Sequence, residues 1–168
     1  MESSRRAVVA SALGGPEVLQ VVEVPVTEPG PGEVRLRVHA AGVNPWDWKS
    51  YAPGSGAHPP VRLGLEVSGV VEETGTGVRW FSEGDEVVAW PVRGGYADVV
   101  TVPQRVLVRR PDRLDPVAAA GLLAAGAATR AIYGRRRRSI KKGEKHLVGG
   151  VRTKVAQSVF HNVTHETL

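Results

Sequence analysis

The sequence predicts a mainly β fold, a small barrel or sandwich closed by one C-terminal helix. Short β-branched runs follow one another closely, and the 20 Gly and 12 Pro residues supply turns between them. One Ala/Leu-rich segment, beginning near residue 115, has a helical pattern instead. The 168 residues, 42% of them hydrophobic, are enough for one domain with its own core. Many short strands at close spacing are typical of such β architectures.

The first predicted strand is VRLRV at 34–38, where apolar residues alternate with Arg. Alternation with a period of two indicates a strand with one buried face and one wet face. The same criteria predict further strands at 67–71, 86–89, 96–102 and 106–108. Turn signals, such as GTG at 75–77 and EGD at 83–85, separate them.

The predicted helix runs from Pro116 to Tyr133. Asp115 is a good N-cap residue, Pro116 suits the first helical position, and Gly134 is a stop signal. We therefore expect the β-barrel to occupy residues 1 to about 114 and this helix to close it.

Charge divides the chain at the same place. Residues 135–168 hold nine Lys/Arg and two Asp/Glu, whereas residues 1–134 hold 13 and 15. We expect a domain over 1–134 and a poorly ordered basic tail over 135–168. The run Arg135–Arg138 leaves nucleic-acid or phosphate binding open, but a solvated charge cluster is the favoured interpretation.

Several classes of protein are excluded or disfavoured by composition. The chain has no cysteine, which excludes disulfides and thiolate metal sites and is consistent with a reducing compartment. We therefore expect a cytoplasmic location. The apolar run at 7–13 is too short for a signal peptide, and no stretch approaches the roughly 20 apolar residues of a membrane span.

Five ordered motifs carry a family resemblance. They are GGPEVLQ at 14–20, PGPGEVRLRVHAAGVNPWDWK at 29–49, GLEVSGVVEETG at 64–75, GDEVV at 84–88 and GGYADVVTVP at 94–103. Together they resemble the zinc-independent, zeta-crystallin-like quinone oxidoreductases of the medium-chain dehydrogenase/reductase superfamily, over about residues 5–134. The resemblance implies a GroES-like, partly open β-barrel, normally followed by a Rossmann domain that binds NADPH. It also implies a quinone or another conjugated carbonyl compound as the substrate.

The residues argue against a zinc site. A catalytic zinc needs three Cys, His or Glu ligands that converge on one point, and zinc-dependent relatives carry a Cys and a Gly-His-Glu motif. This chain has Asn44 and the triplet Gly64-Leu65-Glu66 at these places. We expect no bound metal, and we expect Glu66 to be a structural hydrogen-bonding residue.

The resemblance places the segment NPWDWKSY beside the nicotinamide, so the candidate catalytic residues are Asn44, Asp47, Lys49 and Tyr51. Asn44 would position cofactor or substrate, and Lys49 or Tyr51 would stabilise a developing enolate oxygen. The alternative is structural: a turn at Asn-Pro, Asp47 capping a helical turn and a solvated Lys49. The neighbouring tryptophans at 46 and 48 are expected to be packing residues, with one flanking a flat substrate as the alternative.

The cofactor-binding candidates are Asn44, Thr129, Gly149 and Gly150. The last two lie in KKGEKHLVGGVRTKVAQ, which resembles a shortened copy of the family's strand and glycine loop. Arg152 follows where another glycine is expected, and no second βα unit follows. We therefore expect a truncation or frameshift near residue 134 and no independent binding of NADP(H).

The functional hypothesis is the N-terminal catalytic domain of a zinc-free, NADPH-dependent quinone or enone reductase, inactive by itself. Two alternatives stay open. One is a non-catalytic β-barrel that binds a partner or a second copy through the apolar face of the 116–133 helix. The other is nucleic-acid binding through the tail.

Overall fold

The computed structural model of this chain describes residues 4–122. They lie within one compact unit, Met1–Ala124. The predictions made for Thr129, Gly149, Gly150 and the basic tail fall outside the described residues.

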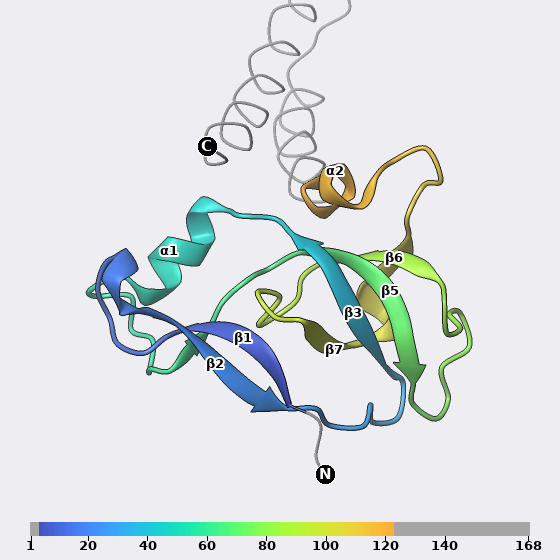
Figure 1. The fold of residues 1–168 in the computed structure, drawn as a ribbon, viewed down its shortest axis with the longest axis horizontal. Helices are drawn as coiled ribbons and strands as arrows, with labels where there is room; N and C mark the ends of the chain where they lie inside the picture. Colours follow the sequence, from blue (N-terminus) through green and yellow to red (C-terminus); the bar gives the residue numbers. More distant parts are fainter. Residues whose placement is uncertain (1–3, 123–168) are drawn as a thin grey trace, which may run out of the picture. The chain divides into compact units, whose positions relative to one another are not determined.

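Two antiparallel sheets make up the described part of the chain (Figure 1). The smaller has the order β2-β1-β4 and contains β1 (Ser4–Ala10), β2 (Leu19–Pro25) and β4 (Val61–Arg62). The larger has the order β7-β3-β5-β6-β8. Its strands are β3 (Glu33–Ala41), β5 (Val67–Thr74), β6 (Glu86–Ala89), β7 (Val99–Pro103) and β8 (Leu107–Arg109). Single-turn 3-10 helices span Pro16–Val18 and Gln104–Val106.

The predicted mainly β class is confirmed, and all five predicted strands are present. The strand expected at 96–102 begins only at Val99. Before it, Ala97 pairs with β1, and Asp98 bonds to both β1 and β3, since its carbonyl also accepts from the N–H of Val38. Ala97 bridges Ala7, and the N–H of Asp98 donates to the carbonyl of Arg6. These bonds join the two sheets. Strands β1, β2 and β4 were not predicted individually.

The main core is aliphatic and lies inside the curl of the larger sheet. Irregular pairing between β3 and β5, at Arg35/Leu36 and Val38/Ala40, accompanies that curl. The buried residues of this core come from five strands and the loops between them: Val34, Leu36, Val67, Val71, Val87, Ala89, Val92, Val100, Val102 and Leu107.

Helix α2 (Pro116–Ala120) begins where the sequence predicts. One carboxylate oxygen of Asp115 accepts hydrogen bonds from the N–H groups of Val117 and Ala118, at 2.9 and 3.0 Å. Ala119 and Ala120 are buried, and the helix packs on β3 and β5. The predicted continuation over 123–133 lies outside the described residues. Neither helix described within 4–122 is long and apolar enough to cross a membrane.

Candidate functional site

Four predicted site residues lie on one short helix, α1 (Pro45–Tyr51), or at its N-cap. Asn44 has an extended backbone, and Pro45 follows at the first helical position. Asp47, three residues after the N-cap, accepts a hydrogen bond from the Asn44 N–H at 2.7 Å. This bond satisfies a donor that a helix start otherwise leaves unpaired. The structural interpretation of Asp47 as a helix cap is therefore confirmed.

Asp47 also ties α1 to the segment that precedes β5. Its side chain is only 5% exposed, and its second oxygen, Oδ1, accepts from the N–H of Gly64 at 3.2 Å. Gly64 has a φ of +95°, and a Cβ atom there would lie 2.5 Å from the backbone nitrogen of Tyr96. Only glycine fits this close approach of two backbones.

The side chain of Asn44 is bonded to a second acidic residue, Glu66, which does not belong to α1. Its Nδ2 donates to Oε1 of Glu66 at 3.1 Å. Glu66 is 1% exposed and lies directly before β5. The prediction that Glu66 is a structural hydrogen-bonding residue is confirmed by this contact. Asn44 itself is half-buried.

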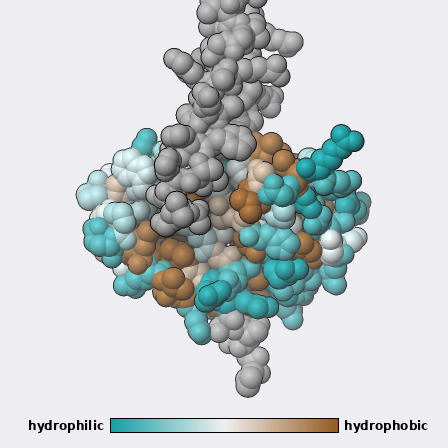
Figure 2. All heavy atoms as spheres, turned by 45° about the horizontal axis from the view of Figure 1, so that its top comes forward, coloured by the Kyte–Doolittle hydropathy of each residue, from teal (hydrophilic) through white to brown (hydrophobic). Residues whose placement is uncertain are grey.

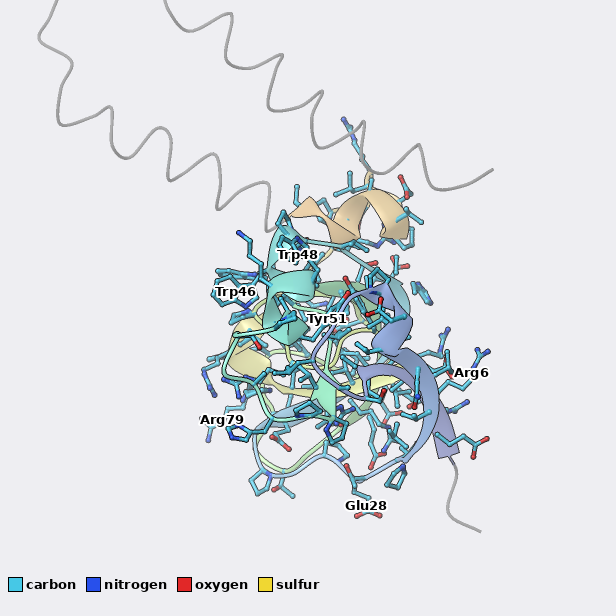
Figure 3. The ribbon with its side chains drawn as sticks, turned by 90° about the vertical axis from the view of Figure 1, so that its left-hand side faces the viewer. Arg6, Glu28, Trp46, Trp48, Tyr51 and Arg79 are labelled. Carbon is cyan, nitrogen blue, oxygen red and sulfur yellow. The ribbon has the colours of Figure 1, made fainter. Side chains whose placement is uncertain are left out.

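Lys49 and Tyr51 point in different directions. Tyr51 is 6% exposed and belongs to a small core cluster with Ala10 and Leu63, and Figure 3 shows it on the side of α1 away from Trp46. Lys49 is exposed, with its Nζ 5.8 Å from the centre of the Trp48 ring. The four candidates thus lie close together at α1, but they do not share one environment. Lys49 is exposed to solvent, Asn44 is half-buried, and Asp47 and Tyr51 are buried.

Tyr96 was missed by sequence reasoning, although it lies in the GGY motif at 94–96. It is half-buried, and its hydroxyl is 3.5 Å from the carbonyl oxygen of Gly42. Burial raises the pKa of Tyr96 well above its ordinary value, and the nearby carboxylate of Asp47 raises it further. The phenol therefore stays neutral at physiological pH beside the two buried acids.

The expectation that Trp46 and Trp48 are packing residues is not met. Both project from α1 (Figure 3), and they are 64% and 55% exposed. Val43, in the preceding loop, is 82% exposed. A seven-residue helix buries only one side, and the positions of Asp47 and Tyr51 occupy that side here.

The residues at this site do not fit a catalytic zinc ion. Within residues 4–122, no three His, Cys, Asp or Glu side chains are grouped closely enough to hold a metal. The sequence has no cysteine, and the Asn44 amide nitrogen, which is not a zinc ligand, faces Glu66.

The profile of the "Alcohol dehydrogenase GroES-like domain" matches residues 30–112. The chain is 40% identical, over 120 residues, to a 2-haloacrylate reductase of Burkholderia sp, covering 67% of this chain and 36% of that protein. It is 36% identical over 148 residues to a quinone oxidoreductase of Pseudomonas aeruginosa, covering 84% of this chain and 45% of that protein. The chain thus spans less than half the length of these relatives.

Solved structures show the same likeness. A quinone oxidoreductase of Pseudomonas syringae pv. Tomato DC3000 superposes with a TM-score of 0.73 at 34% identity, over 83% of this chain and 43% of that one. The Escherichia coli quinone oxidoreductase complexed with NADPH gives a TM-score of 0.69 at 28% identity, over 76% and 40%.

Proposed function

This chain carries an alcohol dehydrogenase GroES-like domain of the quinone oxidoreductase branch of the medium-chain dehydrogenase/reductase superfamily, and we propose that it supplies the substrate-side half of an NADPH-dependent, zinc-free quinone or enone reductase. The substrate class is a flat conjugated carbonyl compound. The similarity to quinone oxidoreductases and to a 2-haloacrylate reductase, whose substrate name denotes a conjugated acid, supports this class.

The observation that carries the proposal is the way Asn44 is held. Its backbone N–H is bonded to Asp47 and its side-chain amide to Glu66. A half-buried amide fixed from two sides is preorganised to bond a polar group of cofactor or substrate, which lowers the entropic cost of binding.

We assign a different role to each of the other candidates. Asp47 positions the start of α1, because both of its oxygens already accept backbone N–H groups. NADPH, when bound, would supply the hydride. The Lys49 ammonium is exposed and free to approach an enolate oxygen as negative charge develops there, and Tyr51, packed beneath the helix, is the second candidate.

The first test is a titration of the purified chain with tetramethyl-1,4-benzoquinone, which has no ring position open to nucleophilic addition. We expect Asn44→Ala to weaken quinone binding by about 2- to 10-fold, the value of one net hydrogen bond. Gln104→Ala is the matched control, because this amide bonds instead to the loop at Gly77 and Arg79. Equal affinity of Asn44→Ala and the parent chain would contradict the proposed role of Asn44.

A second expectation concerns turnover. These 168 residues correspond to 36–45% of the two relatives' length, and hydride transfer requires that donor and acceptor be held together. We therefore expect no quinone-dependent oxidation of NADPH by this chain alone, measured at 340 nm. Sustained oxidation at a rate proportional to chain concentration would contradict this expectation.

An alternative function is an interaction module that binds a partner or a second copy. The exposure of Val43, Trp46, Trp48 and Val117 favours it, and Figure 2 shows brown apolar patches between teal surface on one face. The cytoplasmic location and the nucleic-acid alternative stay predictions from the sequence.

A further inference from the structure

We infer that Glu66, seated against Gly42, is a positioning residue that fixes which end of the Asn44 amide faces a bound ligand. The inference rests on the binding role proposed above for Asn44. It assigns to a buried acid outside α1 a function that none of the candidate residues on the helix performs.

The first step is the chemistry of the contact. A primary amide has two faces of similar shape, an oxygen that accepts and an NH₂ group that donates, and the two exchange by a half-turn of the side chain. A carboxyl oxygen without a proton, as Glu66 Oε1 is in this contact, only accepts hydrogen bonds. The 3.1 Å contact between Asn44 Nδ2 and Glu66 Oε1 therefore selects one orientation. The capping box of α1 engages the other end of the amide, because the Asn44 side chain accepts from the backbone N–H of Asp47. Together the two contacts leave one N–H of the Asn44 amide for another partner.

The second step is the rigidity of Glu66. Its side chain is 1% exposed, and it occupies space that exists only because residue 42 is glycine. A Cβ atom on Gly42 would lie 2.3 Å from Oε1 and 2.7 Å from Cγ of Glu66. The Gly42 N–H also donates to the backbone carbonyl of Glu66 at 3.1 Å. The carboxylate is thus held in a fitted slot and has little freedom to follow a moving amide.

The third step separates orientation from helix capping. The backbone of Asn44 is bonded to Asp47, whose other oxygen is bonded to Gly64. These bonds do not involve the Glu66 side chain. Removing the Glu66 carboxylate should therefore release the Nδ2 end of the Asn44 amide, while the capping box between Asn44 and Asp47 still holds the start of α1.

The test compares Glu66→Leu, which removes the acceptor, with Glu66→Gln, which keeps an acceptor oxygen. Ser68→Ala is the matched control, since Ser68 is also buried, on neighbouring β5, and donates to the carbonyl of Pro116 instead. The first readout is the Asn44 side-chain NH₂ signal in the ¹⁵N spectrum of the full chain, identified by its loss in Asn44→Ala. We expect Glu66→Leu to bring its two proton shifts together and speed exchange with water, while Glu66→Gln and Ser68→Ala leave it near its parent position.

The second readout is affinity for tetramethyl-1,4-benzoquinone. We expect Glu66→Leu to weaken binding by about the same 2- to 10-fold as Asn44→Ala. The double variant should be no weaker than Asn44→Ala alone, because residues that act through one contact are not additive. Additive losses, or full affinity in Glu66→Leu, would overturn the inference. If Glu66→Leu does not fold, Gly42→Ala replaces it, since its new methyl group displaces the carboxylate.

The two proposals fail in different ways. If Asn44→Ala binds the quinone as well as the parent chain, the proposed function of Asn44 is wrong. The NH₂ signal then decides the inference by itself: a change in Glu66→Leu that Glu66→Gln restores supports positioning, and an unchanged signal overturns it.

Discussion

At the scale of single residues, Tyr96 makes stability depend on alkaline pH. Its pKa in the folded chain is raised, first by burial and then by Asp47, whereas in the unfolded chain it has the ordinary value of about 10. Above that pH the unfolded chain loses the Tyr96 proton while the folded chain keeps it. The unfolded state then binds fewer protons, and the free energy of unfolding falls as pH rises.

We therefore expect Tyr96→Phe to lose less stability than the parent chain between pH 9 and pH 11. Urea unfolding at both pH values, followed by circular dichroism, measures the difference. Parallel losses in the two proteins would show that Tyr96 does not contribute. Below pH 9 the folded and unfolded forms of Tyr96 are both neutral, so this contribution is constant there.

Gly64 and Gly54 provide a matched pair of substitutions. Both have a positive φ, +95° and +82°, but a Cβ at Gly64 would meet the backbone of Tyr96 at 2.5 Å while a Cβ at Gly54 would meet nothing within 4 Å. Gly54→Ala should cost about 1–2 kcal/mol, the cost of the left-handed conformation. Gly64→Ala should cost clearly more, because backbone must also move. Urea unfolding of both variants checks this, and equal costs would count against the close approach.

At the scale of elements, the start of α2 is fixed from two sides. Asp115 caps the first turn, and Ser68 on β5 donates to the carbonyl of Pro116. We expect Asp115→Ala to destabilise the domain by about 0.5–2 kcal/mol and Ser68→Ala by about 1 kcal/mol, measured by urea unfolding. Asp112→Ala, an exposed acid just before the cap, is the control and should stay within about 0.5 kcal/mol of the parent chain.

Helix α1 packs one side against the domain and leaves the other side exposed to solvent. Its seven residues are too few to be stable alone, so the bonds of Asp47 and the burial of Tyr51 hold it on the domain. The opposite side is thereby turned outward, which leaves the two tryptophans exposed. The arrangement explains why aromatic residues, expected inside, lie on the surface.

At the scale of the whole molecule, the exposed apolar side chains predict a test of the alternative function. An interaction module should self-associate, and its apparent mass in sedimentation velocity should rise between 5 and 200 µM. The variant Trp46→Ser/Trp48→Ser should abolish this rise, whereas Trp80→Ser, equally exposed at 63%, should not. A single monomer species at all concentrations would remove the support for self-association.

Much of the fold was accessible from local pattern. Alternating apolar residues at 34–38, the β-branched runs and the Asp115-Pro116 start predicted strands and a helix that the structure contains. Strand β2 was not predicted, since it has no buried residue and its first three residues are all exposed, so that no clear alternation marks it. Strand β1 was not predicted either, although Ala7, Val9 and Ala10 in it are buried. The late start of β7 was also hidden, because it depends on where residues 97 and 98 turn from pairing with β1 to pairing with β3, and this is a tertiary contact.

The candidate site, like the fold, could be predicted from the sequence only in part. The sequence by itself determined the residue types around Asn44, the absence of a thiol ligand and the family's motifs, because these are local or compositional. Only the tertiary structure decided that Asn44 meets Glu66, 22 residues away, and that Gly64 and Tyr96 close around Asp47. The physical reason is that such contacts depend on how the segments before β5 and β7 approach α1, and no periodicity within one segment encodes that approach.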